Sequence, residues 1–152
     1  MKHGLNVAVL LVALLATGCA TIKPPRSFSK VTAPGWASIE IREEVDYDHA
    51  WKTVVGILVR DFDLQFVSKD DGYLRTDWLY SWSGVYQPNY RVRVIAKFAD
   101  DRKTLGVKSE AQALVTDPMS GRPTGTWVMG VDSRLMSTIK TDLMGTIGRT
   151  TR

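Results

Sequence analysis

Hydrophobic and polar residues alternate along the chain with two different periods, and these periods predict its elements. Ile39, Ile41 and Val45 alternate with charged residues, which predicts a half-buried strand that begins near residue 38. The next hydrophobic residues recur every three or four positions, which predicts an amphipathic helix capped by Asp46 or Asp48. The apolar stripe of this helix contains Tyr47, Ala50, Trp51, Val54, Val55, Leu58 and Val59.

Two β-hairpins are predicted after this helix. In the first, alternating residues lie on either side of Lys69-Asp70-Asp71-Gly72, a turn whose glycine can adopt a positive φ. The second hairpin turns at Asp100-Asp101-Arg102. We expect Trp78, Tyr80 and Tyr90 to face the core with the other alternating residues. The alternating sets are Phe62, Leu64 and Phe66; Leu74, Thr76, Trp78 and Tyr80; Tyr90, Val92, Val94, Ala96 and Phe98; and Leu105, Val107, Ser109, Ala111 and Ala113.

The last part of the chain predicts a loop and a second helix. Proline and glycine between Asp117 and Gly125 indicate a loop, and a short apolar stretch from Trp127 to Met129 follows it. Asp132 or Ser133 can then cap a helix that has its own apolar stripe. This stripe contains Leu135, Met136, Ile139, Leu143 and Ile147.

The element order is therefore β-α-β-β-β-β-α. Because each helix has one apolar stripe and each strand one apolar face, the most economical packing is a two-layer α+β domain. We expect an antiparallel sheet of about four to six strands with both helices on one of its faces. Residues 38–148 are predicted to form this single domain, and residues 149–152 a frayed tail.

The packing of the second helix decides whether the layer between helix and sheet is filled. We expect its stripe to press on the sheet face that contains Val92, Val94 and Val107, which closes the core. Met136 favours this packing, because a flexible methionine fills irregular gaps over small residues. The alternative is room for an apolar ligand, and it rests on the small residues Ala96, Ser109, Ala111 and Ala113.

The amino-terminal apolar run is too short to span a membrane. It covers about ten residues, whereas a spanning helix needs roughly 20. It ends in Leu14-Leu15-Ala16-Thr17-Gly18-Cys19, which resembles the lipobox of bacterial lipoproteins. The resemblance implies a signal peptide over residues 1–18 and a mature chain that starts at Cys19, with a diacylglycerol on the thiol and a further acyl chain on the amine. The alternatives are an ordinary cleaved signal peptide and a short membrane anchor.

The lipobox resemblance also implies a location. In Gram-negative lipoproteins an aspartate after the cysteine usually retains the protein at the inner membrane, and Ala20 stands at that position here. We therefore expect a lipid-anchored protein of the outer membrane that faces the periplasm. Residues 19–37 contain three prolines and follow no period, which predicts a flexible tether. Its basic residues either touch anionic headgroups or belong to a solvated linker: Lys23, Arg26 and Lys30.

Charge and cysteine content narrow the possible partners. The formal net charge is +4, and the basic residues are spread along the chain without a recognisable nucleic-acid motif. We expect no nucleic-acid partner. Cys19 is the only cysteine, so a lipid on it leaves no thiol for a disulfide or a metal site. No cofactor and no metal are expected.

Part of the chain resembles a known family. The segment from Ala50-Trp51 through Leu58 and Leu64, and then Asp70-Asp71-Gly72-Tyr73-Leu74-Arg75-Thr76-Asp77-Trp78, is similar to the helix, strand, acidic turn and strand of BamC-type (NlpB/DapX-type) lipoproteins. Those lipoproteins are accessory members of the complex that assembles outer-membrane β-barrels. The resemblance implies a helix-grip-like fold over about residues 38–148 and a protein partner in the envelope.

A catalytic site is not expected. His49, on the polar side of the first helix, lies beside Asp46 and Asp48, a grouping that could form metal ligands or an acid-base pair. Carboxylates at the start of a helix are more simply explained by capping and by the helix dipole. No phosphate loop, His-Glu metal motif or paired-carboxylate signature is present. An envelope enzyme that depends on His49 is the weakest of the alternatives.

Two loop aromatics are the candidate contacts with a partner. Trp82 and Tyr86 have no periodic reason to be buried, and exposed large aromatics often anchor a partner. The alternative is that both fold back over the end of the core. We expect a non-enzymatic interaction module held at the outer membrane through lipid on Cys19. The alternative is a carrier that binds an apolar ligand or lipid between helix and sheet.

Overall fold

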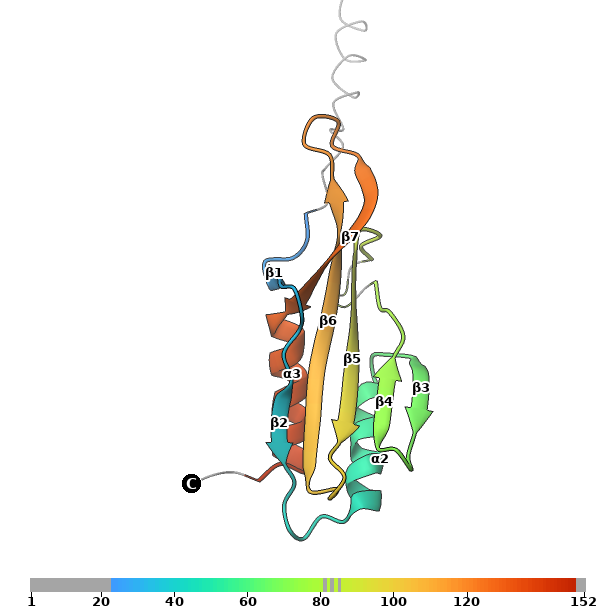
Figure 1. Ribbon diagram of the computed structural model, residues 1–152, viewed down its shortest axis with the longest axis vertical. Coiled ribbons are helices and arrows are strands. Elements are labelled where there is room, and N and C mark those ends of the chain that lie inside the picture. The colour runs from blue at the N-terminus through green and yellow to red at the C-terminus, as the bar shows by residue number, and fades with distance from the viewer. Residues whose placement is uncertain (1–22, 81, 83, 85, 150–152) are drawn as a thin grey trace, which may run out of the picture.

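Seven antiparallel strands and two helices form the part of the chain that the computed structural model describes, residues 23–80, 82, 84 and 86–149. The protein has an α+β fold with an open sheet (Figure 1). Among these residues no helix is both long enough and apolar enough to cross a membrane. The elements are β1 (Phe28–Lys30), β2 (Ala37–Glu40), α2 (Tyr47–Leu58), β3 (Leu64–Ser68), β4 (Tyr73–Thr76), β5 (Tyr90–Phe98), β6 (Thr104–Thr116), β7 (Pro123–Asp132) and α3 (Ser133–Thr146).

The long strand β6 organises the sheet. The strand order is β1-β7-β6-β5-β4-β3, and β2 pairs with β6 beside β7. One edge of β6 is shared, because β2 pairs with it as far as Val107 and β7 pairs with it from Ala111. At residues 108–110, between these pairings, β6 has no strand partner on this side within the described chain. The sheet is therefore split along this edge.

Both predicted helices are present with a predicted capping residue. The Asp46 side chain accepts from the backbone N–H of His49 at 2.7 Å and caps α2. Asp132 accepts from the N–H of Leu135 at 2.9 Å and caps α3. These bonds satisfy amides that have no partner within the first turn.

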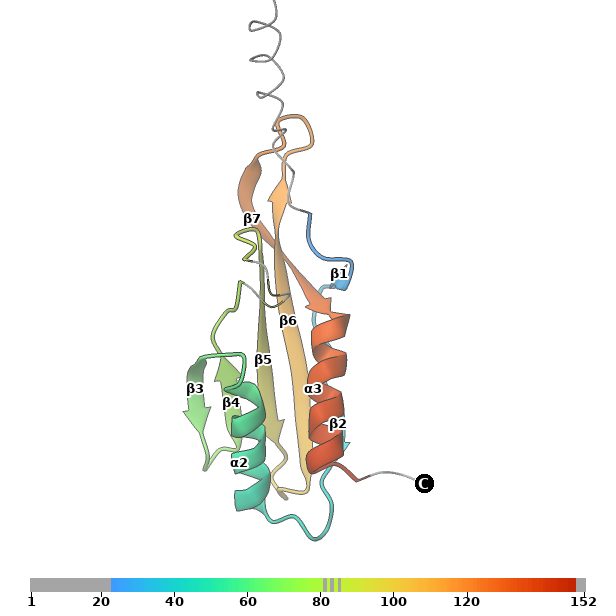
Figure 2. The ribbon, with the colours of Figure 1, turned by 180° about the vertical axis from the view of Figure 1, so that it is seen from behind.

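The two helices cover the same face of the sheet, as expected, and Figure 2 shows them side by side in front of the strands. The exposed fraction is 0% for Leu135, Leu143 and Val107, so no space large enough for a water molecule adjoins them. The layer between α3 and the sheet is filled at these positions. The other hydrophobic residues on this side that are at most 2% exposed are Ile39, Ala50, Val54, Leu58, Leu74, Val92, Val94, Ala96, Phe98, Leu105, Ala111, Ile139 and Ile147.

A buried carboxylate joins three segments beneath the sheet edge. Asp132 is 0% exposed and accepts from the Ser27 hydroxyl at 2.9 Å, from the Tyr90 hydroxyl and from the amide of Leu135. Burial raises the pKa of Tyr90 above its ordinary value, and the hydrogen bond to Asp132 raises it further. These donors compensate the cost of burying the carboxylate.

The strand count corrects the sequence-based expectation at both ends. β1 lies within the predicted tether 19–37 and pairs with β7, so Phe28 is opposite Asp132. The Phe28 ring lies over Gly130, where a Cβ atom would come within 2.2 Å of the ring. The proline-rich composition of this segment predicted a linker. A strand of only three residues is too short to show a hydrophobic period, and its partner β7 lies far along the chain, so the sequence pattern did not reveal it.

β7 is the second strand that the pattern missed. Residues from Pro123 were expected in a loop, with only a short apolar stretch after it, but the strand is ten residues long. Its first residues pair with β6 beyond the end of the helix layer, and Pro123 to Thr126 are exposed. Polar and apolar positions do not alternate where neither face is buried, so the sequence carried no strand period there.

Register shifts also turn two groups of aromatics away from the core. If the pairing of Arg75 with Ile95 continued in register, Trp78 would lie opposite Val92, but Leu79 lies there instead. One extra residue is therefore accommodated after Thr76, and alternation reverses. The expectation that Trp78 and Tyr80 face the core is wrong, whereas Tyr90 is buried as expected.

A second bulge lies in β3. Leu64 is opposite Thr76 and Phe66 is opposite Arg75, so Gln65 is the extra residue. Phe66 is 48% exposed for this reason, although Leu64 packs against the core. At the other end of the domain Arg149 donates its N–H to the carbonyl of Glu40 at 2.7 Å, so this residue of the predicted tail is bonded to β2.

Candidate functional site on the open face of the sheet

The sheet face opposite the helices carries most of the exposed chemistry. Alternation in β5 places Val92 and Val94 towards the helices and Arg91 and Arg93 on the open face. The pairing with β4 and β6 extends this face across the sheet. Its residues include Trp36, Ser38, Phe66, Tyr73, Arg75, Trp78, Tyr80, Arg91, Arg93, Ile95, Lys97, Gly106, Lys108, Glu110, Gln112 and Trp127.

Tryptophan and arginine side chains form a ladder along the part of this face that is nearer the β6–β7 turn. The Arg91 guanidinium lies 4.3 Å from the ring centre of Trp127 and 4.6 Å from that of Trp78. Arg93 lies 4.3 Å from the same Trp78 ring. We call Trp78, Arg91, Arg93 and Trp127 the Trp–Arg ladder. Cation–π contacts of this kind each contribute about 0.5 to 2 kcal/mol, depending on desolvation.

Hydrogen bonds fix the arginines of the ladder. Two nitrogens of Arg91 donate to the side-chain oxygen of Gln112 at 2.8 and 2.6 Å, and a third donates to the Tyr80 hydroxyl at 3.0 Å. Arg93 donates to Glu110 at 2.7 Å. The ladder therefore connects β5, β6, β7 and the segment after β4, and each of its two guanidinium groups is already bound to a side chain of β6. It is suited to stiffening the open face rather than to binding a ligand.

Glu110 neutralises part of this charge from a buried position. It is 7% exposed and accepts from Arg93 and from Lys108, whose ammonium lies 2.9 Å away. Burial raises the pKa of Glu110, but the hydrogen bonds and charges of Lys108 and Arg93 outweigh burial and hold the pKa below its ordinary value. The carboxylate is ionised at neutral pH, and the two cations beside it are satisfied.

Farther from the β6–β7 turn than the ladder, the face carries two more cations, Arg75 and Lys97, with different surroundings. Arg75 lies between Phe66 of β3 and Ile95 of β5 in one cross-strand row. Its Nε atom is buried and has no acceptor among the described residues. Lys97 is exposed in the next row, between Tyr73 and Gly106. Unlike those of the ladder arginines, the Arg75 side chain forms no hydrogen bond or ion pair with another described residue, so its terminal nitrogens, rather than the buried Nε, can donate to an outside group.

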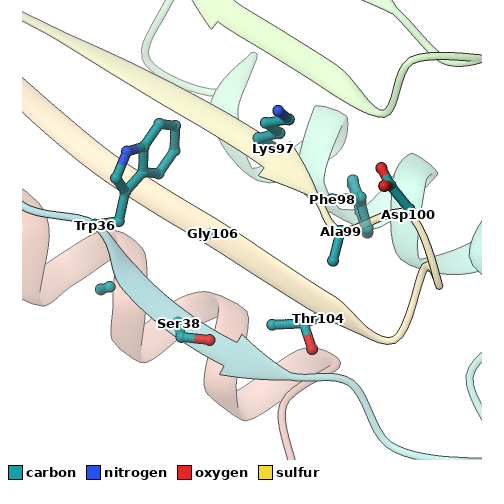
Figure 3. Close-up of a pocket in the computed structure, with 9 residues that line it drawn as sticks. Trp36, Ser38, Lys97, Phe98, Ala99, Asp100, Thr104 and Gly106 are labelled. Atoms are coloured by element: carbon teal, nitrogen blue, oxygen red, sulfur yellow. The ribbon is translucent and has the colours of Figure 1, made fainter.

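A shallow pocket of about 400 Å³ adjoins Lys97. Gly106 forms its floor, and a Cβ atom there would lie 3.3 Å from the Trp36 ring. Trp36 stands at one side and Lys97 at the other, and both rise from strands or strand ends around the glycine (Figure 3). Trp36 is 50% exposed, and the ammonium of Lys108 lies 5.0 Å from its ring centre.

These residues form one continuous surface at the end of the sheet away from the β6–β7 turn. We call Trp36, Phe66, Tyr73, Arg75, Lys97 and Gly106 the open-face patch, and Ile95, which is 4% exposed, lies buried between them. It combines exposed aromatic surface, a hollow over a glycine and basic groups. Trp36 and Phe66 are among the few large hydrophobic residues that remain about half exposed. Such a surface is typical of protein contacts, in which aromatic and arginine residues predominate.

The two predicted contact residues have different environments. Trp82 is partly buried and stacks on Phe62 with ring centres 6.3 Å apart, so it folds back over the end of the core. Tyr86 is 69% exposed and lies 6.2 Å from the ring of Tyr80. Tyr86 remains available to a partner, but it lies beyond the Trp–Arg ladder rather than in the open-face patch. The predicted lipidation site, Cys19, lies outside the described residues.

The acidic residues around His49 have structural roles. Asp46 caps α2, and Asp48 pairs with Lys69 at 2.9 Å. The hydrogen bond and charge of Lys69 lower the pKa of Asp48. His49 is exposed, and no group of three or more potential metal-binding residues occurs in the part of the chain described by the structure. The geometry brings no nucleophile or base to this histidine.

Sequence reasoning missed most of the open-face patch. Trp36 was assigned to the tether, and Phe66 to the core because it follows Leu64 by two positions. The available signal was Arg91, Arg93 and Lys97 on alternate positions of one strand, with Trp and Tyr before it. That pattern indicates a basic face with aromatics nearby, but it does not reveal which strands flank it.

A second pocket lies where the sheet edge is split. It has a volume of about 410 Å³ and lies between the start of α3 and the strands, with Ser109, Val131, Met136 and Lys140 in its lining. Ser109 is 2% exposed, and its hydroxyl has no hydrogen-bond partner among the described residues. This pocket is the observation that favours a carrier.

No protein-family model and no curated protein matches the chain.

Proposed function

We propose that the protein is an outer-membrane lipoprotein, anchored through Cys19 on the periplasmic side, whose domain is a non-enzymatic interaction module for an envelope protein. The observation that carries the proposal is the open-face patch. It presents Phe66, half exposed beside Arg75, and Trp36, half exposed on the far side of β5 and β6, and the Arg75 side chain forms no hydrogen bond or ion pair with another described residue. The lipobox resemblance supports the anchor, and the similarity to BamC-type lipoproteins supports a partner in β-barrel assembly.

The chemistry of the patch specifies the partner's contact segment. An apolar side chain fits the hollow over Gly106 beside the Trp36 ring. Carboxylates on the β5 and β4 side of that side chain would pair with Lys97 and with Arg75, whose planar guanidinium can bind a carboxylate in a bidentate manner. The partner therefore presents an acidic segment with an apolar anchor. Burial of the anchor supplies affinity, and the charges orient it.

Site-specific crosslinking tests the module. A photoreactive phenylalanine analogue replaces Trp36 in one variant and Lys52, an exposed residue of α2, in the matched control. We expect position 36 to capture one envelope protein that position 52 does not. Adding Arg75→Glu to the first variant should reduce the yield, because it reverses the charge that faces the partner. Equal or absent capture at the two positions would contradict the proposal.

The anchor is tested separately. Wild-type protein should incorporate labelled fatty acid, and Cys19→Ser should accumulate as an unacylated precursor that fractionates differently while the domain keeps its fold. The fold is expected to persist because the buried core residues of the described chain begin at Ile39, well after Cys19 in the sequence. Absence of label in the wild-type protein would contradict the lipid anchor without affecting the crosslinking result.

A carrier is the second candidate function. It places an apolar ligand at the split edge, with Ser109 as its polar contact and Lys140 at the rim. The filled layer around Leu135 and Leu143 weighs against a larger site under the helix. Native mass spectrometry of protein purified from membranes would favour the carrier if a lipid of stoichiometric amount is retained, and Ser109→Leu should then release it.

A further inference from the structure

The β6–β7 turn extends beyond the rest of the sheet. The pairing of β5 with β6 ends at Ala113, whereas β6 and β7 continue to the pair of Thr116 and Pro123. Figure 1 shows this hairpin at one end of the long axis and α2 towards the other end. Neither helix of the described chain covers the hairpin there. An exposed apolar group at its apex is therefore available to whatever lies beyond this end.

The apex has a defined turn. One oxygen of Asp117 accepts from the N–H groups of Met119 and Ser120 at 2.9 and 2.7 Å and from the Ser120 hydroxyl at 3.0 Å. The N–H of Gly121, a residue with φ +66°, donates to the Asp117 carbonyl at 2.9 Å. These bonds hold the turn in one conformation, so the ordering cost of presenting its apex is already met.

Met119 is the most exposed large hydrophobic residue among those described. Its exposed fraction is 98%, compared with 69% for Tyr86 and 50% for Trp36. It stands between Pro118 and Ser120, and Arg122 follows on the same turn. An apolar apex with a basic residue beside it suits a phospholipid interface, where the thioether reaches the acyl boundary and the cation reaches phosphate.

The amino-terminal end of the described chain lies at this same end of the molecule. Lys23 and Pro24 line a pocket together with Thr116, Asp117, Pro118 and Gly121 of the hairpin. Cys19 precedes Lys23 by four residues, which span at most roughly 14 Å when fully extended. If Cys19 carries lipid, the membrane surface therefore lies within that reach of Lys23.

We propose that the β6–β7 turn contacts the phospholipid surface that holds the acyl chains on Cys19, with Met119 inserted into the interface and Lys23 and Arg122 at the phosphates. This inference rests on the lipid anchor proposed above. It fixes the orientation of the domain, because Gly106 of the open-face patch lies ten positions along β6 from Thr116, roughly 33 Å in an extended strand. The patch is thus held away from the bilayer and faces the periplasm.

The experiment uses the acylated full chain in vesicles of phosphatidylethanolamine and phosphatidylglycerol. Cys19 is the only native cysteine and is consumed by acylation, so Met119→Cys accepts an environment-sensitive fluorophore at one site. Lys52→Cys on α2, labelled in the same way, is the matched control. Both positions are exposed, so neither substitution disturbs the core.

We expect the label at position 119 to emit at shorter wavelength and to be quenched by headgroup nitroxide lipids at least about twofold more than the label at position 52, as for side chains that enter the interface. Arg122→Glu should reduce this difference. Intact mass separates the two possible failures. An acylated protein whose two labels are equally accessible to water overturns the membrane contact alone, whereas a protein without acyl mass overturns the anchor and this inference together.

Discussion

The two faces of the sheet are held in different ways, and β5 shows both. Its residues Val92 and Val94 are 0% exposed beneath the helices, where shape and volume determine stability. Arg91 and Arg93, which alternate with them, lie on the open face and are held by aromatic rings, an amide and a carboxylate. The open face thus obtains rigidity from directional contacts without a second covering layer. Each kind of contact predicts a different response to mutation.

The largest loss of stability is expected on the helix face. Ile139 is 2% exposed between α3 and the sheet, and Ile139→Ala should lower the free energy of unfolding by about 2 to 5 kcal/mol because it leaves a cavity. Urea denaturation measures this as a lower midpoint at an unchanged slope. Lys140→Ala, at the next and exposed position, should stay within about 0.5 kcal/mol. A loss below about 1 kcal/mol for Ile139→Ala would show that α3 is a loosely packed lid.

Removing the buried charge of the open face should cost less. Glu110→Gln keeps the volume but leaves Arg93 and Lys108 without a charged partner, so we expect a loss of about 1.5 to 3 kcal/mol at neutral pH. The folded protein has the lower pKa for this carboxyl, so its contribution is full above the unfolded pKa of about 4.3 and disappears as the pH falls through the folded value. Unfolding curves of the two proteins from pH 7 to pH 3 should therefore converge at the acid end. A gap that does not change with pH would contradict the assigned ion pairs.

Breaking the Trp–Arg ladder should have a smaller effect. Trp78→Leu removes two cation–π contacts and should cost about 1 to 2 kcal/mol, measured by thermal unfolding. Tyr86→Leu is the matched control, since that aromatic is 69% exposed and should change stability by less than about 0.5 kcal/mol. If the two variants are equally stable, the ladder contributes no rigidity and the open face depends on its backbone pairing.

The smallest stability effect is expected in the open-face patch. Trp36→Ser should lower stability by less than about 1 kcal/mol, because half of the side chain is already exposed. Its binding effect should be large, since a central aromatic anchor commonly accounts for about 2 kcal/mol or more of an interface. The measurement is the amount of the partner, once crosslinking has identified it, that wild-type and Trp36→Ser protein recover in a pull-down without crosslinker. Unaltered recovery would remove Trp36 from the interface.

The helix face was predictable because its signals are local. The capping residues and the apolar stripe of each helix lie within single segments, and the structure selects Asp46 and Asp132 from the two capping candidates predicted for each helix. Two residues at the end of α2 differ from the predicted stripe, since Ile57 is buried and Val59 is half exposed. Helix ends are the positions that a periodic pattern places least well. Local periodicity thus fixed which residues form this side of the core.

The open face was less predictable because register shifts are not local. The extra residues after Thr76 and after Leu64 reverse alternation and place Trp78 and Phe66 outside, yet both have the spacing of core residues. The position of Trp36 on the open face was missed for another reason, since this residue precedes a short strand whose partner, β6, lies far along the chain. Cross-strand pairing, rather than composition, assembles the patch, and a single sequence does not encode that pairing in its period.

The early strands pair with late ones, and this determines the order in which the fold can form. Ser27 bonds to Asp132, 105 positions later, and β2 has its strand partner in β6. β1 cannot form its native ladder before β7 is available, and β2 cannot form its ladder before β6 is available, so closing these long loops is a late and slow step of folding. If Cys19 is lipidated as proposed, β1 would still be unpaired when the first part of the chain is exported. Docking of β1 on β7 would then bring the folded domain close to the lipid.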